Sequence, residues 1–310
     1  MQLNRISSNL MFDKAISQMA KTKDELGQLQ LQLTTGKQVV KPSDAPDKSA
    51  EISRLKSSID RQESYVNTIT KVRDKLAQQE NAINSASSLL YRLKELTVQA
   101  ANDSYSAEDR KSIDIEVRQL RDQMLSLANT QDENGNFIFS GTRVKTLAFA
   151  FGENGKINYQ GDNTVSSASI GDMSKVEINR SGTNPFNKIL RINDDGSKIA
   201  VSFFEVIDDL SSSLNSNNNI EITRSVGEIE SLQKGLSNNL AHIGGSLNKM
   251  ENQLSVTEEN ILRMSSTLAR IEDVDYTEAI TQLNKEMLAL EAAQSSFAKI
   301  SQLNLFDYIR

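Results

Sequence analysis

Residues 276–310 read YTEAITQLNKEMLALEAAQSSFAKISQLNLFDYIR, and this stretch decides the fold. Its apolar side chains recur at steps of three and four residues, which is the spacing of one coiled-coil seam. They are Tyr276, Ile280, Leu283, Met287, Leu290, Ala293, Phe297 and Ile300. Neither proline nor glycine interrupts the stretch, so we predict one long helix. Its end, residues 302–310, stays apolar, which indicates a surface that binds a partner.

The N-terminal segment carries a matching apolar stripe. It consists of Phe12, Ile16, Met19, Leu26 and Leu33, and is interrupted by Lys23 and Gln30. Each stripe is too narrow, and the rest of its helix too polar, for a helix that is buried all round. Two such helices would bury their seams against each other. We therefore predict a chain that begins and ends in one coiled coil.

The composition of the 310 residues is typical of long helices in bundles, with 25% charged and 5% aromatic residues and no tryptophan. A net charge of −6 leaves no basic surplus for binding a nucleic acid backbone. Because the chain has no cysteine, it forms neither disulfides nor thiolate metal sites. The N-terminus lacks the apolar core of a secretory signal, and no run of about 18 apolar residues could span a membrane.

Helix boundaries can be placed in the first half of the chain. Pro42 and Pro46 lie in one loop, which should follow a first helix that ends near Gly36. A second helix is predicted from about residue 47 to 101, which is about 75 Å at 1.5 Å per residue. Ser106 and Asp109 have the spacing of a capping box, so a third helix should run from there to about residue 130.

From residue 134 to about 200 the sequence changes to glycines, asparagines and short alternating runs. This pattern predicts a small β module inserted between helices. The expected strands are 136–139, 156–159 and 175–178, and the expected tight turns are 153–156 and 194–196.

A helix is expected again from 203 to 214, and a heptad pattern then runs from Leu240 to Ile271 without a slip. The next step, from Ile271 to Tyr276, is five residues, so the phase of the pattern breaks. We interpret residues 272–275 as a joint, with Asp275 as the N-cap of the last helix. If the chain ends pair, this joint lies beside the loop that contains Pro42.

The predicted fold class is mainly α with an inserted β domain. Long coiled-coil helices pair the two chain ends, and a helical bundle carries the small outer β domain. The expected parts are 1–45 with 272–310 as the terminal coiled-coil core, 46–135 with 201–271 as the helical bundle, and 136–200 as the outer β domain.

The sequence offers no catalytic constellation. His242, the only histidine, falls between two heptad positions, which favours a partly exposed helix residue over a catalytic base. Residues 194–196, Asp-Asp-Gly, are similar to the start of a calcium loop, but no ligand follows at the required spacing. The acids of the β module show no pairing suited to glycan hydrolysis: Glu153, Asp162, Asp172 and Glu177. We predict no enzymatic activity, no metal and no cofactor.

Several motifs resemble those of the bacterial flagellin superfamily, in the same order along the whole chain. They are LTTGK at 33–37, PSD at 42–44, NGNFIFSGT at 134–142, DVDYTEAI at 273–280 and AKISQLNLFDY at 298–308. The third and the last of these resemble the hook-associated branch of the superfamily. Flagellin itself ends in a leucine-rich tail that has a different sequence.

The resemblance implies paired terminal helices, a helical bundle, an outer β domain and a structural role. It implies a ring of copies at the hook–filament junction, with the first hook-associated protein on the hook side and flagellin on the filament side. It also implies type III export without a cleaved signal to the extracellular flagellum, with a chaperone that holds the C-terminal helix. A flagellin filament subunit is the alternative, and a glycan-acting or glycan-binding module on a stalk is a third hypothesis.

Two groups of candidate site residues follow. The candidates for self-assembly and partner binding are apolar residues of the terminal helices: Phe12, Ile16, Met19, Leu26, Leu283, Met287, Leu290, Phe297, Leu303, Leu305 and Phe306. The candidates for the interlayer joint are Pro42, Asp44, Asp273 and Asp275.

Overall fold

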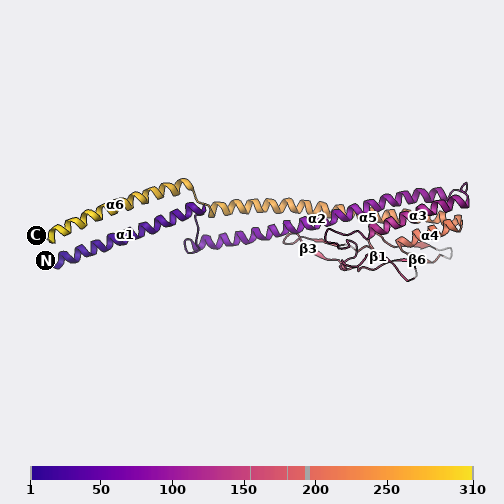
Figure 1. The fold of residues 1–310 in the computed structure, drawn as a ribbon, viewed down its shortest axis with the longest axis horizontal. Coiled ribbons are helices and arrows are strands. Elements are labelled where there is room, and N and C mark those ends of the chain that lie inside the picture. Colours follow the sequence, from indigo (N-terminus) through magenta and orange to yellow (C-terminus); the bar gives the residue numbers. More distant parts are fainter. Residues whose placement is uncertain (1, 154, 180, 193–195, 309–310) are drawn as a thin grey trace. The chain divides into compact units, whose positions relative to one another are not determined.

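Figure 1 shows the fold in a computed structural model, which describes residues 2–153, 155–179, 181–192 and 196–308. The helices are α1 (Gln2–Thr35), α2 (Pro46–Ala100), α3 (Ala107–Ala128), α4 (Phe203–Asn215), α5 (Asn219–Glu272) and α6 (Tyr276–Tyr308). The strands are β1 (Phe149–Phe151), β2 (Ile157–Tyr159), β3 (Ser167–Ser169), β4 (Lys175–Glu177), β5 (Ile189–Ile192) and β6 (Lys198–Val201). The predicted fold class, mainly α with an inserted β segment, is confirmed.

The chain folds as two compact units. The first comprises Met1–Arg61 with Glu259–Arg310, and the second comprises Gln62–Glu258. The long helices α2 and α5 each contribute residues to both units.

In the first unit, α1 and α6 lie side by side and antiparallel, so that the start of α1 is near the end of α6 (Figure 1). The rings of Phe12 and Phe297 meet edge to face, with their centroids 5.4 Å apart. Leu26 and Ala279 are buried in the same seam nearer the joint. The predicted pairing of the terminal helices is therefore confirmed.

α1 ends at Thr35 because the next residue, Gly36, leaves the helical conformation with φ of +71°. Glycine adopts this left-handed conformation without the steric cost that a side chain would add. A Cβ on Gly36 would also lie only 3.1 Å from the hydroxyl of Tyr276, so the position favours glycine on two grounds. The predicted end of the first helix is confirmed.

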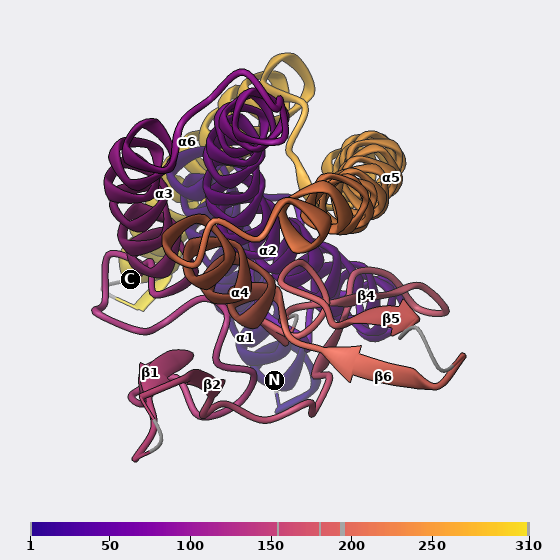
Figure 2. The same ribbon diagram turned by 90° about the vertical axis from the view of Figure 1, so that its right-hand side faces the viewer.

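The helices of the second unit surround one apolar core, and Figure 2 shows them nearly end-on. α2 contributes Ile69, Leu76, Ile83 and Leu90, and α5 contributes Ile229, Leu236, Ile243 and Met250. The predicted capping box at the start of α3 is confirmed, because Ser106 and Asp109 each accept a hydrogen bond from the other's backbone N–H. α4 also begins with a capping box, formed by Ser202 and Glu205.

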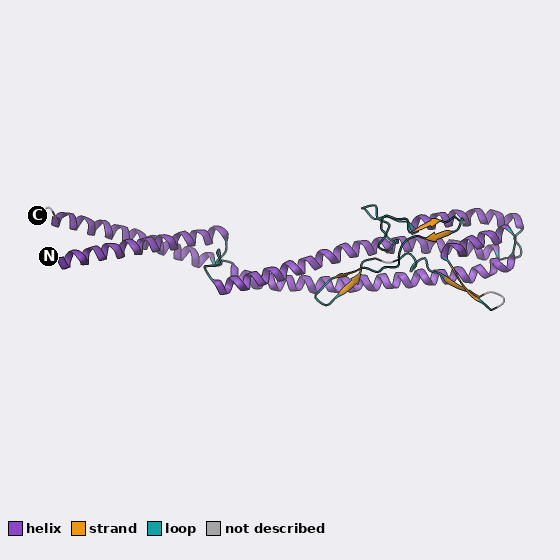
Figure 3. Ribbon diagram, turned by 90° about the horizontal axis from the view of Figure 1, so that it is seen from below, coloured by secondary structure: helices purple, strands orange, loops and turns teal. Residues whose placement is uncertain are grey.

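Within the described residues, the β segment forms three separate antiparallel hairpins, β1–β2, β3–β4 and β5–β6, and Figure 3 shows them spaced along the helices. Isolated two-stranded hairpins are only marginally stable, so they need other support. That support is the core shared with the helices, in which Phe149, Ile157, Ile170 and Val176 are buried. The hairpins therefore depend on the bundle for their packing.

An ion-pair network also connects the β5–β6 hairpin to the helices. Arg191 of β5 donates two hydrogen bonds, of 2.6 and 2.8 Å, to the carboxylate of Glu228 on α5. It donates a third, of 2.6 Å, to Asp209 on α4. Arg191 and Glu228 are about nine-tenths buried, so this pair is shielded from water far better than a surface ion pair.

The expected strand at 136–139 is wrong, whereas the strands predicted near 157 and 175 are confirmed as β2 and β4. Instead of forming a strand, residues 136–139 make an isolated bridge between Phe137 and Gln131 and single backbone hydrogen bonds to other segments. Ile138 N donates to Thr130 O, Ile138 O accepts from the side chain of Gln79, and Phe139 O accepts from Gly182 N. The predicted turns at 153–156 and 194–196 include residues 154, 194 and 195, which lie outside the described residues.

Candidate functional site

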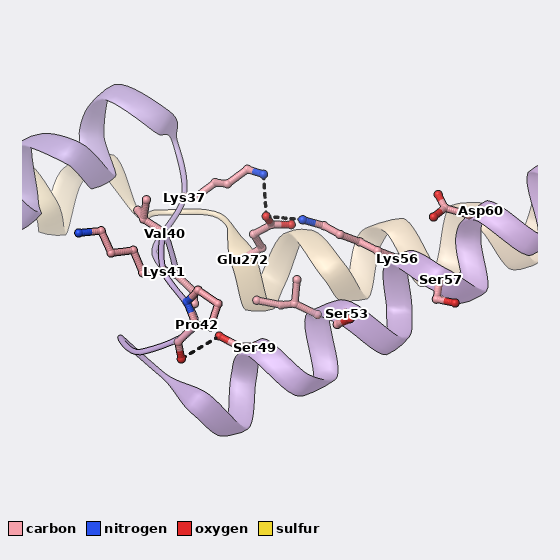
Figure 4. Close-up of a pocket in the computed structure, with 12 residues that line it drawn as sticks. Lys37, Val40, Lys41, Pro42, Ser49, Ser53, Lys56, Ser57, Asp60 and Glu272 are labelled. Carbon is pink, nitrogen blue, oxygen red and sulfur yellow. Dashed lines mark hydrogen bonds and ion pairs between the residues drawn. The ribbon is translucent and has the colours of Figure 1, made fainter.

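A cluster of charges marks the joint between α5 and α6, within the first unit. Glu272 is the last residue of α5, and one of its carboxylate oxygens lies 2.7 Å from Nζ of Lys37 and 2.7 Å from Nζ of Lys56 (Figure 4). Lys37 follows α1, and Lys56 lies near the start of α2. A single carboxylate at the end of α5 thus connects the segment that follows α1 with the start of α2.

Backbone hydrogen bonds reinforce the same junction. Gln38 N donates to Glu272 O at 2.6 Å, and Val274 N donates to Gly36 O at 3.0 Å. Together they form a short antiparallel bridge between Lys37 and Asp273. The segment after α1 and the joint before α6 are therefore held side by side, as the sequence predicts.

Two of the four candidate joint residues, Asp273 and Asp275, lie at this bridge, and the other two, Pro42 and Asp44, lie in the loop that follows Lys37. Asp273 takes part in the bridge, and Asp275 caps α6 by accepting from the backbone N–H groups of Thr277 and Glu278. Asp44 accepts from the backbone N–H of Lys41 at 2.8 Å, which closes the turn after Pro42. These side chains thus shape the backbone of the joint, whereas the ion pairs come from other residues.

A cavity of about 480 Å³ opens beside the ion pairs (Figure 4). Its lining combines lysines, serine hydroxyls and apolar side chains: Lys37, Val39, Val40, Lys41, Pro42, Ser49, Ile52, Ser53, Lys56, Ser57, Asp60 and Glu272. Across the described ranges, no group of three or more His, Cys, Asp or Glu is placed to hold a metal ion. His242 is exposed on α5, as its place in the heptad pattern predicts.

The ion pairs shift the protonation of their members. Burial opposes ionisation of Glu272, but hydrogen bonds from Lys37 and Lys56 outweigh it and hold the pKa of the carboxyl below its ordinary 4.5. The hydrogen bond to Glu272 raises the pKa of Lys37 in turn. Because folding lowers the pKa of Glu272, its stabilising contribution is complete above about pH 4.5 and is lost as pH falls through the lower, folded value.

We expect Glu272→Gln to lower the free energy of unfolding of the first unit by about 1–2 kcal/mol at pH 7. A charged hydrogen bond contributes about 1.5–3 kcal/mol, and partial exposure of the two lysines, at 46% and 43%, reduces this. Urea denaturation followed by circular dichroism measures the change. The difference from the unsubstituted chain should shrink as the pH falls below about 4.5 and Glu272 becomes protonated.

Glu259→Gln is the matched control. It removes the same charge from the same helix, where the pair with Arg263 is about two-thirds exposed and contributes little. Equal destabilisation by the two substitutions would contradict a special role for Glu272.

The candidate assembly residues are only partly covered by the pairing of α1 with α6. Leu26 is buried, and Phe12, Met19, Leu283, Leu290 and Phe297 are half-buried in the seam. Ile16 and Met287 are each 51% exposed, outside it. Leu303, Leu305 and Phe306 lie in α6, but their side chains are outside the described residues.

Further apolar side chains of the terminal pair are exposed along α1 and α6. They are Leu10, Leu31, Tyr276, Ile280 and Leu288. Burial of a single such side chain contributes about 1.5–3 kcal/mol, so a partner that covers several would gain substantially. We define this set, with Ile16 and Met287, as the apolar flank of the terminal pair.

Sequence reasoning missed the ion-pair cluster. Glu272 ends a heptad run and looks like a solvated helix terminus, and Lys56 lies 216 residues away along the chain. Nothing in either local pattern signals the pairing. Only the LTTGK motif at 33–37, which contains Gly36 and Lys37, indicates that this region has a specific role.

The two helical ends of the chain match known protein families. Residues 6–144 match the bacterial flagellin N-terminal helical region, and residues 226–309 match the bacterial flagellin C-terminal helical region. Together these matches span more than half of the chain. The chain belongs to the bacterial flagellin superfamily.

Members of this superfamily similar to the chain include hook-associated proteins. "Flagellar hook-associated protein 3" of Salmonella typhimurium is 25% identical, and the similarity covers 99% of this chain and 100% of that protein. A putative flagellar hook-associated protein of Vibrio parahaemolyticus has a similar fold, with a TM-score of 0.65 and 23% identity over 74% of this chain and 100% of the other. The flagellar junction protein of Legionella pneumophila has a TM-score of 0.55 and 20% identity, covering 73% and 99%.

The superfamily assignment agrees with a structural role in the flagellum. Among the described residues, no helix has both the length and the apolarity needed to cross a membrane.

Proposed function

We propose that the protein is a component of the hook–filament junction of the bacterial flagellum. In this proposal copies of the chain form a ring, with the first hook-associated protein on the hook side and flagellin on the filament side. The similarity to hook-associated protein 3 over nearly the full length of both chains supports this assignment. The observation that carries it is the apolar flank of the terminal pair, because a chain acting alone would leave this surface in water.

Each part of the chain then has its own layer in the assembled junction. Residues 1–45 and 272–310 form the inner layer, where the apolar flank packs against neighbouring copies. Residues 46–135 and 201–271 form the next layer, and residues 136–200 lie outermost. Before assembly the chain is exported without cleavage through the flagellar type III channel, and a chaperone shields residues 276–310. In this arrangement the bridge around Glu272 joins the inner layer to the next one.

Immunogold labelling of isolated flagella tests the function directly. We expect label in one band where the hook meets the filament. Label along the whole filament would instead identify a flagellin subunit, which is the alternative function. Negative-stain images of the purified chain after salting out give a second criterion, since long filaments would favour the alternative.

Deletion of residues 303–310 should abolish swimming in soft agar while leaving the second unit folded. Residues 303–308 are the last residues of α6, far along the chain from Gln62–Glu258, so circular dichroism should still show the cooperative unfolding of that unit. The truncated chain should appear in the culture medium together with unassembled flagellin. Normal filaments on cells that carry only the truncated chain would contradict a role for this end in assembly.

A further inference from the structure

The β5–β6 hairpin presents apolar side chains to water. Successive side chains of a strand point to opposite faces of its sheet. One face of this hairpin carries Ile189, which is buried, and Arg191, which bonds to the helices. The other face carries Leu190 and Ile192, which are 70% and 63% exposed, and Ala200, which pairs with Leu190 and is also exposed. A sheet face that meets water is usually polar, so this hairpin face indicates a contact that an isolated chain does not make.

A second apolar surface lies on the outer side of α2. Tyr91 and Val98 are 59% and 51% exposed, and they are seven residues apart, so they lie on one side of the helix about two turns from each other. An open hollow of about 470 Å³ lies along this side, lined by Tyr91, Lys94, Glu95, Val98 and Gln99. Glu95 already pairs with Arg92 at 3.1 Å. This α2 face, formed by Tyr91 and Val98, would therefore hold a partner through apolar contact rather than through charge.

Ion pairs to α5 place the two faces at nearly the same level of the second unit. Arg191 of the hairpin bonds to Glu228, and Nζ of Lys94 lies 3.7 Å from the carboxylate of Glu230. Glu228 and Glu230 are two residues apart, which is about 3 Å along the helix and about 200° around it. The hairpin and this part of α2 therefore lie on different sides of α5, and they lie apart in the view along the helices (Figure 2).

We propose that the hairpin face of one copy packs against the α2 face of the next copy around the junction. This inference rests on the proposed function, which places copies side by side in a ring. The contact is heterologous, because two different faces meet, and heterologous contacts close into rings when the repeated rotation returns to its start. Since the two faces lie at nearly the same level, copies with parallel helices gain little rise from one to the next, as a closed ring requires.

The size of the two faces identifies a second copy as the partner. Their five side chains would bury on the order of 500 Å², which is less than half of the roughly 1,200 Å² of a stable interface. A freely diffusing protein would gain too little from this contact to stay bound. A neighbouring copy that the terminal helices already hold nearby is present at a high effective concentration, so for it the same small contact is sufficient.

Disulfide trapping tests the contact, and the chain has no cysteine of its own. Cells assemble flagella from chains that carry Leu190→Cys with Val98→Cys, or Leu190→Cys with Tyr91→Cys, and a mild oxidant is then added. Each bond joins two thiols whose Cα atoms come within about 7 Å, and passes two electrons and two protons to the oxidant. We expect at least one of these two pairs to give a ladder of dimers, trimers and larger species on a non-reducing gel. All three positions are more than half exposed, so the substitutions leave the core intact.

Leu190→Cys with Asn84→Cys is the matched control. Asn84 is exposed on the same side of α2, because 14 residues make nearly four helical turns, but it lies about 21 Å from Val98. This pair should therefore stay monomeric, as should the test pairs in dilute solution before assembly. A ladder from the control pair as strong as that from the test pairs would indicate random collision and overturn the inference.

Two further outcomes separate this inference from the proposed function. Swimming cells whose junctions contain the variants, with no ladder from either test pair, would overturn the inference and leave the proposed function intact. Dimers of the single variant Leu190→Cys would indicate that two hairpins meet, which would also overturn it. Immunogold labelling that fails to find the chain at the junction would remove the proposed function and this inference together.

Discussion

Replacing Phe186 with alanine is expected to lower the free energy of unfolding of the second unit by about 3–5 kcal/mol, the range for a buried phenylalanine. Phe186 is 3% exposed. Its ring contacts four others, those of Phe139, Phe149, Phe203 and Phe204, with centroids 5.1–6.1 Å apart. It therefore connects the β segment to α4. Truncation would leave a cavity at the centre of this cluster and lose several edge-to-face contacts.

Urea denaturation measures this loss, with far-UV circular dichroism for the helices and near-UV circular dichroism for the aromatic cluster. The latter signal comes from tyrosine and phenylalanine, because the chain has no tryptophan. Phe151→Ala is the matched control: this phenylalanine is in the same β segment but 55% exposed, so its loss should cost roughly 0.5 kcal/mol. Similar midpoints for the two variants would show that the β segment is not packed as described.

The double substitution Leu290→Asp with Phe297→Asp is expected to abolish both assembly and chaperone binding. Both side chains are half-buried in the seam of α6, and the Phe297 ring packs edge to face on Phe12. Two carboxylates in this seam would have to lose water without gaining a partner, which costs several kcal/mol. Calorimetry with the purified chaperone and swimming in soft agar measure the two effects.

Asn284→Asp with Ser295→Asp adds the same charge to α6 at exposed positions. This control should bind the chaperone and support swimming like the unsubstituted chain. If the seam variant binds the chaperone with unchanged affinity, the chaperone site lies elsewhere on the chain. If its cells swim normally, the terminal seam does not carry assembly.

The sequence determined the helical framework of this protein. The steps of three and four from Tyr276 onwards define α6, and the five-residue step after Ile271 locates the joint that precedes it. Gly36 terminates α1 as expected, and Ser106 with Asp109 caps α3. Such features are readable because each depends on residues within one or two helical turns, so the local sequence holds all the information needed.

Only the tertiary structure decided the features that join distant segments. Residues 136–139 alternate like a strand, yet two of their carbonyl groups accept hydrogen bonds from the remote residues Gln79 and Gly182. Glu272 takes its two lysines from the far end of the chain, at positions 37 and 56. In each case the partner lies outside the reach of any local pattern. Which donor meets which acceptor is set by how the long helices bring remote residues together, and helical periodicity does not encode that choice.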